Sequence, residues 1–507
     1  MAALRAADHE LAVPDSTARG GRWRLFRNIG FLVSSQVTTW GLSLLWNIFV
    51  PRVLGPTKMG EWVVGVAVSQ MIFMALGLGI GTLMIKEIAA DRIRAPKIVG
   101  AAIVMRLALA PVAFCAVAAY SLLLHTSVEL TTVIALATAT VLMQLFSGPL
   151  LVALQSIERM EYNAYAEVLK GVALALCIPL VIAGLGLYSM MLCILVAGLA
   201  VLALSWYWYH RHFTIDLHAG FGEIRRLAFG SLPYWTTGLV LNFYLWIDSL
   251  LLSAFAPLEA VGWYGVTTRL MGTLLFVPTI LSTAYLPRLV RAWKEGHDAL
   301  GAEARPPLEL VLILGMPVAA GAALVAPKLI SDIYGASYLP AVVVLVLLAL
   351  CVPSIYLSIM ANQVLVAAGR QLAWTKVMVG AAIVNPALNL VLIPYGRVHW
   401  HNGAEGAAVA LLITETAMAG IAVALMPRVL NRASGVRVAK ALAATIAMSA
   451  LVFVLRGHVG LIAQVVSGLV CFVALALALR ILSHEQAEAL RGLAGRMRLR
   501  SPFGGRS

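Results

Sequence analysis

Charged residues are scarce in this sequence. They make up 12% of the chain, whereas a soluble domain carries about 25%. Hydrophobic residues make up 61%, and the mean hydropathy is +0.91. Water is therefore not the main solvent of the protein surface. The length of 507 residues therefore limits how many times the chain can cross a bilayer and does not indicate a number of soluble domains.

Several catalytic and metal-binding signatures are also missing. The five cysteines all lie in apolar stretches, and none has a CxxC or metal-ligand spacing. The chain has no P-loop and no GxGxxG preceding a strand. The region around Pro14 and Arg19 lacks the apolar core of a cleaved signal peptide. The sequence therefore predicts no disulfide framework, no zinc site and no cofactor.

The excess of positive charge predicts topology. The formal net charge is +14, but the basic residues lie between apolar spans and are not clustered among aromatic residues. Nucleic acid is therefore not a predicted partner. With the amino terminus inside, 29 of the 37 lysines and arginines are cytoplasmic, five are outside and three lie within spans. This asymmetry predicts that both termini are cytoplasmic.

Apolar segments long enough to cross a bilayer predict an all-α polytopic membrane protein with about fourteen transmembrane helices. The first two predicted spans cover residues 30–51 and 62–84. Two segments echo each other at equivalent points of the chain: residues 54–62, which read LGPTKMGEW, and residues 255–263, which read FAPLEAVGW. An even number of helices per unit makes this a parallel repeat about the membrane normal.

The repeat predicts two six-helix lobes related by a parallel pseudo-two-fold, followed by a helix pair. The predicted divisions are a cytoplasmic tail over 1–28, a first lobe over 29–210, a cytoplasmic linker over 211–229, a second lobe over 230–427, helices 13 and 14 over 428–482, and a basic cytoplasmic tail over 483–507.

An ordered set of short motifs carries a resemblance to a known family. The motifs are Arg52-Val53-Leu54-Gly55-Pro56 with Gly60; Ala153-Leu154-Gln155 with Arg159, Met160 and Tyr162; Trp246 to Leu252 with Val261-Gly262-Trp263-Tyr264, Arg269 and Leu270; Ile333-Tyr334-Gly335 with Tyr338; and Asn389, Ile393-Pro394, Gly403 and Ala407-Ala408. In order and spacing the chain resembles the Wzx-like polysaccharide flippases of the multidrug/oligosaccharidyl-lipid/polysaccharide exporter superfamily. The resemblance covers residues 28 to 426.

The resemblance implies a carrier of the cell inner membrane and no covalent chemistry. Such a carrier moves an undecaprenyl-diphosphate-linked oligosaccharide from the cytoplasmic to the outer leaflet by alternating access. It would serve the biosynthesis of O antigen, capsule or exopolysaccharide. The implied partners are the lipid-linked oligosaccharide, membrane lipids, a coupling ion (proton or sodium), a glycan polymerase and a chain-length regulator.

Ionisable residues within spans cost roughly 2.5 to 3.5 kcal/mol each on insertion scales, so they are candidates for function. Asp248 and Arg269 are predicted at similar depth in adjacent spans. They either pair with each other or act separately. A guanidinium binds a diphosphate through bidentate hydrogen bonds, so Arg269 is the first candidate for a headgroup contact. It also matches a cavity arginine expected in the related lipid II flippases.

Three further basic residues complete the predicted substrate-binding set. Arg106 and Lys170 lie in the cytoplasmic half of the first lobe and could form an inner phosphate site. Lys170 could instead be neutralised by Glu167, one helical turn away, and Arg106 could snorkel or pack within the lobe. Arg52 belongs to the first motif and lies at the outer side.

Glu415 lies near the middle of an apolar span. An acid at that depth is costly unless it is protonated, paired or facing water. Glu415 and Asp248 are each predicted either to bind a coupling ion or to belong to a structural pair. A protonated Glu415 bonded to Asn385 or Asn389 is the alternative.

Three other functions compete with the flippase interpretation. A cation-coupled multidrug exporter of the same superfamily is expected to carry an acid in its first helix, and this first helix has none. A lipid II flippase is also fourteen-helical, but its arginine-rich amino-terminal segment is only loosely matched by Arg22, Arg24 and Arg27. A membrane-embedded glycan polymerase or ligase requires a sizeable outside loop, and every predicted outside loop is short.

Overall fold

The computed structural model describes residues 16–216, 220–426 and 429–481, and every regular element in these ranges is a helix. The all-α prediction is confirmed for this part of the chain. The predicted basic tail over 483–507 lies outside the described residues, as do residues 1–15 of the predicted amino-terminal tail.

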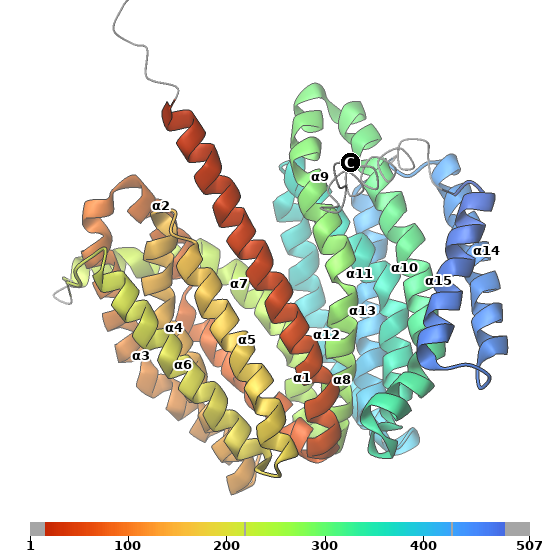
Figure 1. Cartoon of the computed structure of the whole chain (residues 1–507), viewed down its shortest axis with the longest axis horizontal. Helices are drawn as coiled ribbons and strands as arrows, with labels where there is room; N and C mark the ends of the chain where they lie inside the picture. Colours follow the sequence, from red (N-terminus) through yellow and green to blue (C-terminus); the bar gives the residue numbers. More distant parts are fainter. Residues whose placement is uncertain (1–15, 217–219, 427–428, 482–507) are drawn as a thin grey trace, which may run out of the picture. The chain divides into compact units, whose positions relative to one another are not determined.

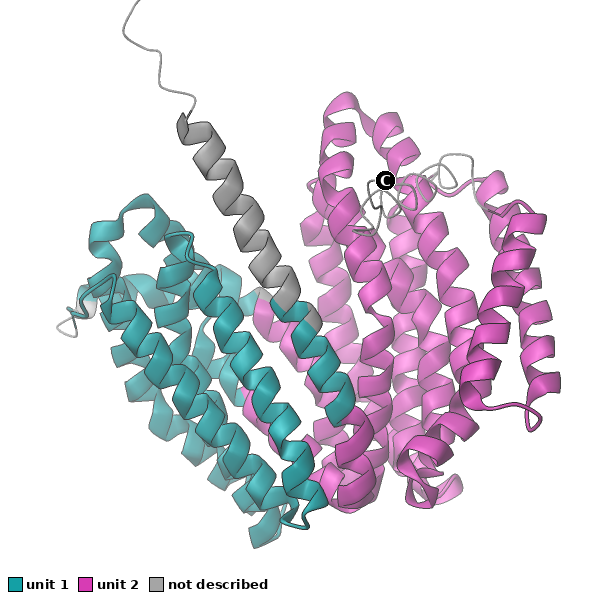
Figure 2. Cartoon of the chain, in the orientation of Figure 1, with its two compact units in different colours: residues 1–46, 72–236 teal, residues 47–71, 237–507 magenta. Residues whose placement is uncertain are grey.

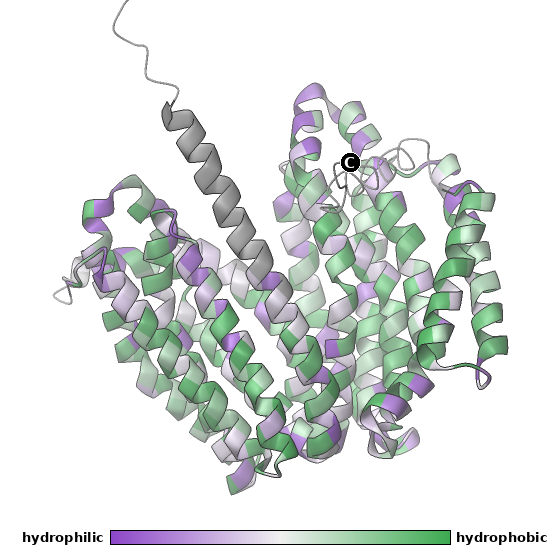
Figure 3. Ribbon diagram, viewed as in Figure 1, coloured by the Kyte–Doolittle hydropathy of each residue, from purple (hydrophilic) through white to green (hydrophobic). Residues whose placement is uncertain are grey.

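The described helices include thirteen candidate membrane spans with mean hydropathies of 1.5 to 2.7. Figure 3 shows apolar residues along most of their length and hydrophilic residues gathered toward their ends. The first candidate, Thr38–Gly77, has 40 residues, or about 60 Å at 1.5 Å per residue, which is twice the thickness of a bilayer core. It belongs to α1 (Ser16–Gly77), which is broken at Gly55 (φ 78°, ψ 168°). The break falls between the predicted spans 30–51 and 62–84, so the polytopic prediction is confirmed.

The chain forms two compact units, shown in different colours in Figure 2. Of the described residues, the first unit holds 16–46 and 72–236, and the second holds 47–71 and 237–481. The chain passes between units inside α1 and inside α7 (Phe221–Phe255). The predicted lobes are defined by the sequence repeat, whereas the two units are defined by packing. The lobe boundaries therefore stay a prediction.

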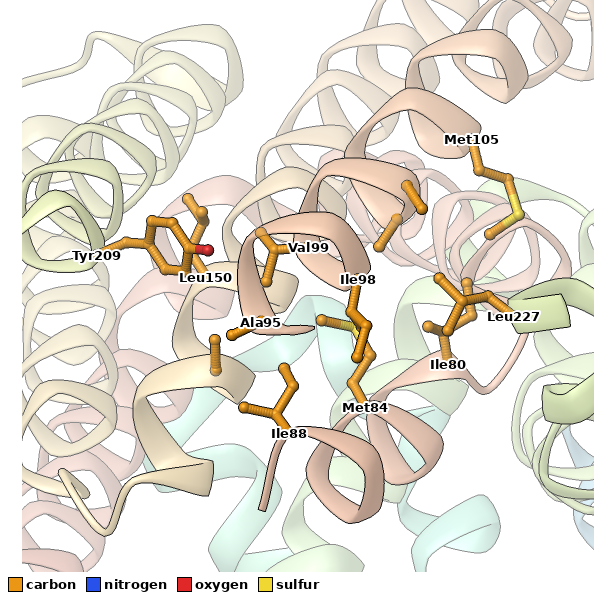
Figure 4. Close-up of a cluster of buried hydrophobic side chains, with 13 residues drawn as sticks. Ile80, Met84, Ile88, Ala95, Ile98, Val99, Met105, Leu150, Tyr209 and Leu227 are labelled. Atoms are coloured by element: carbon orange, nitrogen blue, oxygen red, sulfur yellow. The ribbon is translucent and has the colours of Figure 1, made fainter. Parts of the chain in front are cut away.

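The first unit is built around an apolar cluster on its second helix. Besides parts of α1 and α7, the unit contains α2 (Ile80–Ala90), η1 (Arg92–Arg94), α3 (Ala95–Leu123), α4 (Val128–Ser156), α5 (Glu161–Ile182) and α6 (Gly186–His210). Ile80, Met84 and Ile88 recur every four residues and therefore share one face of α2. They are buried with Ile98 of α3 and Leu227 of α7, as the close-up in Figure 4 shows.

The second unit contains the remaining helices. They are α8 (Leu258–Leu274), α9 (Phe276–Glu295), α10 (His297–Tyr334), η2 (Ala336–Tyr338), α11 (Ala341–Ala367), α12 (Gln371–His399), α13 (Gly403–Leu425), α14 (Arg432–Leu455) and α15 (Leu461–Ala478), which are labelled in Figure 1 apart from η2. α11 is the most apolar candidate span, with a mean hydropathy of 2.7. Gly315 of α10 allows Pro353 of α11 to approach closely, because a Cβ there would lie 3.0 Å from the Pro353 Cα.

A buried acid joins the carboxyl-terminal helix pair to α10. Glu309 is fully buried, and its carboxylate accepts hydrogen bonds of 2.6 Å from both Ser434 Oγ and Arg437 Nη1 of α14. Asn431 and Ser434 form a capping box at the start of α14. An apolar cluster that includes Ile313, Val325, Met448 and Phe472 continues the contact through the span. The helix pair is therefore part of the second unit.

We expect Arg437→Gln to lower the melting temperature of the purified protein. The change leaves a buried carboxylate without its cation, which costs about 3 kcal/mol or more. The double variant Glu309→Gln/Arg437→Gln should recover most of the loss, because two neutral amides can share the site. Thermal unfolding in detergent measures both, with Arg456→Gln at the exposed far end of α14 as the control. Equal melting temperatures for Arg437→Gln and Arg456→Gln would contradict the role of this contact.

Candidate functional site

Arg269 of α8 lies over an aromatic ring in the second unit. Its Cζ is 3.9 Å from the centre of the Trp62 indole, and its Nη1 donates to Asn47 Oδ1 at 3.4 Å. Stacking on an indole holds the face of a guanidinium, whereas the N–H donors point outward in its plane. This contact holds the guanidinium against the indole ring.

A close helix crossing brings Trp62 and Arg269 together. A Cβ added at Gly60 would lie 1.9 Å from the Leu258 carbonyl oxygen, and one at Gly262 would lie 2.0 Å from the Pro56 carbonyl oxygen. Only glycine permits this approach, which is typical of helix pairs in membranes. The two contacts are reciprocal, so they are compatible with the predicted pseudo-two-fold, which stays a prediction.

Arg52 binds protein carbonyl groups at the end of α10. Its Nη1 donates to Asp332 O at 2.9 Å and to Ile333 O at 3.3 Å. A cation at a helix carboxyl terminus stabilises the unpaired carbonyl groups and the negative end of the dipole. The structure thus places this predicted substrate-binding residue in a helix cap.

Asp248 lies in a buried polar cluster of the second unit and is 5% exposed. Its Oδ2 accepts from the Tyr264 hydroxyl at 2.7 Å, and its Oδ1 accepts from Asn389 Nδ2 at 2.8 Å. Asn389 Nδ2 also donates to Asn385 Oδ1 at 2.9 Å. The described contacts of Asp248 are therefore with a tyrosine and an amide, and the alternative of a direct pair with Arg269 is not what the structure contains.

Glu415 has a different partner from the one expected. Its Oε1 accepts from the Tyr244 hydroxyl at 2.6 Å, and the side chain is buried on α13. The asparagines that were candidates for Glu415 belong instead to the Asp248 cluster. Sequence reasoning could not separate these options, because Tyr244 and Glu415 are 171 residues apart in the chain.

Two amide atoms of this cluster lack partners. The buried Asn385 Nδ2 and Asn389 Oδ1 have no hydrogen bond among the described residues. Carboxylate and amide oxygens are the ligands that hard cations prefer. No group of three or more His, Cys, Asp or Glu side chains suited to a metal occurs in the described ranges. Asp248, Asn385 and Asn389 thus bring carboxylate and amide oxygens together in one buried cluster.

Arg106 is buried between α3 and α4 of the first unit and is 8% exposed. Its Nη1 donates to the Leu145 carbonyl oxygen. Its Nε has no partner in the described part of the chain. Gly148 lies beside the same guanidinium, since a Cβ there would be 3.5 Å from Nη1. The packing alternative for Arg106 therefore has direct support.

Lys170 pairs with its neighbour on α5. Its Nζ lies 2.6 Å from Glu167 Oε1, as the local alternative predicted. Lys170 also lines a cavity of about 190 Å³ together with Gln144 and Ser147 of α4. Arg106 contacts Leu145 of α4 instead, and no contact joins it to Lys170 within the described residues. The structure does not bring the two into a shared inner site.

Sequence reasoning missed the aromatic partners of the candidate residues. Trp62, Tyr244 and Tyr264 all contact ionisable groups within spans. Trp62 and Tyr264 lie in or beside the sequence motifs, but nothing in the sequence indicates which side chain each would meet. An aromatic residue at the depth of a buried charge is the signal that could have identified them.

Solved structures of a flippase and of membrane transporters share this fold. A structure described as lipid II flippase MurJ in an inward closed conformation has a TM-score of 0.74 and 13% identity, covering 89% of this chain and 99% of its own. An inward-facing multidrug resistance MATE family transporter of the MOP superfamily has a TM-score of 0.59 and 16% identity, covering 80% and 95%. A MOP superfamily transporter from Pyrococcus furiosus has a TM-score of 0.50 and 15% identity, covering 82% and 96%.

The candidate spans define a multi-pass membrane protein, and its fold is the one seen in these solved transporter structures. A family model described as polysaccharide biosynthesis protein matches residues 25–293, more than half of the chain. The chain therefore belongs to the polysaccharide biosynthesis protein family, and the resemblance to Wzx-like flippases is confirmed. No curated protein sequence matches the chain.

We expect Tyr264→Phe to destabilise the second unit. The change removes the 2.7 Å donor to Asp248 and leaves a buried carboxyl oxygen unsatisfied, at a cost of about 1–3 kcal/mol. Thermal unfolding in detergent should show a lower melting temperature than for Tyr188→Phe, a control at a partly exposed tyrosine of α6. If the two variants have the same melting temperature, the Tyr264 hydroxyl does not stabilise the cluster.

Proposed function

We propose that this protein translocates an undecaprenyl-diphosphate-linked oligosaccharide from the cytoplasmic to the outer leaflet of the inner membrane. The glycan serves O-antigen, capsule or exopolysaccharide biosynthesis, and the protein works by alternating access with both termini in the cytoplasm. Membership of the polysaccharide biosynthesis family is the observation that carries the proposal. The transporter fold and the positive-inside asymmetry of the loops support it.

Arg269 is the proposed contact for the diphosphate. It is held against Trp62, so little side-chain entropy is lost when its N–H groups bind an oxyanion. Guanidinium binds phosphate oxygens in a bidentate manner. Arg106 and Lys170 have secondary roles in this proposal, since a backbone carbonyl and Glu167 respectively already engage them. Arg52 also has a secondary role in this proposal, since it already donates to the carbonyl groups at the end of α10.

The Asp248 cluster is the proposed site of ion coupling. Asp248 and Glu415 are buried acids, and the amide oxygens beside Asp248 complete an oxygen-rich environment. Binding of a proton or a sodium ion there would neutralise charge that is costly within a span. An ion gradient or the membrane potential then drives transport.

Lipid II is the second candidate substrate. The fold shared with lipid II flippase MurJ extends over 89% of this chain and 99% of that one. Both candidate substrates carry an undecaprenyl diphosphate, so the arginine argument applies equally to each. The two candidates differ in the sugar and in the consequence of losing the protein.

Deletion of the gene should leave the lipid-linked oligosaccharide assembled but trapped in the cytoplasmic leaflet. In the deletion strain, the Arg269→Ala variant should deliver about ten- to a hundredfold less glycolipid to the outer leaflet than the wild-type protein does. The reason is the loss of charged hydrogen bonds to the diphosphate. Arg269→Lys keeps the charge but not the bidentate geometry, and activity retained by it would favour simple charge. Glycan at the cell surface and the leaflet distribution of the lipid measure the outcome.

Normal surface delivery of the glycan in the deletion strain would refute the flippase proposal. Loss of peptidoglycan precursor export with normal surface glycan would select lipid II as the substrate. Immunoblots of each variant control for its level in the membrane.

The ion proposal has its own test in proteoliposomes. We expect Asp248→Asn to make transport independent of an imposed sodium or proton gradient, because the exchanging charge is gone. Asp298→Asn, an exposed acid at the start of α10, is the matched control and should respond to the gradient as the wild type does. A gradient response that survives in Asp248→Asn would exclude Asp248 as the coupling group.

A further inference from the structure

The first unit contains a cavity with four polar side chains in a mainly apolar lining, and the diphosphate contact does not explain its role. It lies among α4, α5 and α6 and has a volume of about 190 Å³. Its polar lining consists of Thr140, Gln144, Ser147 and Lys170. Ala173, Leu174, Ile194, Ala197, Gly198 and Val201 form the apolar remainder.

The cavity offers hydrogen bonds without a net charge. Lys170 Nζ is neutralised by Glu167 at 2.6 Å. The hydroxyls of Thr140 and Ser147 donate to carbonyl oxygens of their own helix, at 3.0 and 3.2 Å, which leaves their lone pairs as acceptors. The side-chain amide of Gln144 supplies both donors and an acceptor. The lining is thus mixed in hydrogen-bonding character and neutral overall.

Polar side chains line one of the two pockets that involve α4 and α6. A second pocket, of about 590 Å³, lies among α3, α4 and α6 and is lined entirely by hydrophobic residues, including Ile103, Phe146, Leu150 and Trp206. Both pockets involve residues of the same two helices, so membrane composition alone does not explain the polar lining of the first. Placing an amide such as that of Gln144 within a span is costly unless it meets a polar partner.

The chemistry of this cavity differs from that of the Arg269 site. A diphosphate would meet a single cation in this lining, Lys170, whose ammonium group is already paired with Glu167. A sugar ring has hydroxyls that both donate and accept, and apolar C–H faces that pack against aliphatic side chains such as Leu174 and Ile194. The volume suits one such ring and not an oligosaccharide.

We propose that this cavity binds a single sugar unit of the transported glycan and not its phosphates. The proposal rests on the proposed flippase function and adds a sugar contact to it. Gln144 and Thr140 recognise sugar hydroxyls, whereas Arg269 recognises the diphosphate.

The test compares two lipids bound to the purified full chain in detergent. One is undecaprenyl diphosphate without sugar, and the other is the undecaprenyl-diphosphate-linked oligosaccharide that the deletion strain accumulates. Gln144→Leu and Thr140→Val should each weaken binding of the glycolipid about two- to tenfold, the effect of one neutral hydrogen bond. Both should leave binding of the bare lipid unchanged, which also shows that the variants are folded.

Two controls make the result specific. Gln371→Leu changes an exposed glutamine at the start of α12 and should bind both lipids as the wild type does. Arg269→Lys should weaken both lipids alike. If Gln144→Leu and Thr140→Val weaken both lipids equally or neither, the sugar site is refuted and the flippase proposal stands. If the wild type binds neither lipid, the proposed function fails and the sugar site with it.

Discussion

Within a bilayer core there is no water to satisfy a polar group, so each buried charge must find its partner in the protein. Asp248 is bonded to Tyr264 and Asn389, Glu309 to Ser434 and Arg437, and Arg106 to a backbone carbonyl. Apolar side chains cannot provide the same selectivity, because lipid tails are as apolar as leucine. Polar contacts and close glycine crossings therefore define which helices are neighbours.

The glycine crossing of α1 and α8 shows how packing positions chemistry. Since Gly60 and Gly262 remove side-chain bulk, Trp62 comes within 3.9 Å of the Arg269 guanidinium. The same short helix, α8, also carries Tyr264, which bonds Asp248. One helix of 17 residues thus contacts both the anionic cluster and the cationic site of the second unit.

Local pairs were predictable and distant ones were not. Lys170 and Glu167 are three residues apart on one helix, and the structure pairs them as their spacing indicated. Insertion cost likewise singled out Asp248, Arg106 and Glu415, which are all buried. Their partners could not be predicted, because Asn389 is 141 residues from Asp248 in the chain. The sequence also does not indicate which acid a tyrosine within a span will contact.

The sequence by itself determined that the chain is helical, spans a membrane many times and carries few internal charges, because length and hydropathy are properties of each segment alone. The tertiary structure decided what those charges do. Arg52 binds the carbonyl groups at the end of α10, and Arg269 lies over the Trp62 ring. Asn389, a candidate partner of Glu415, is bonded to Asp248 instead. A span that is apolar on every side has no preferred face. Its rotation and depth, and hence the partner of each polar side chain, follow only from packing against other helices.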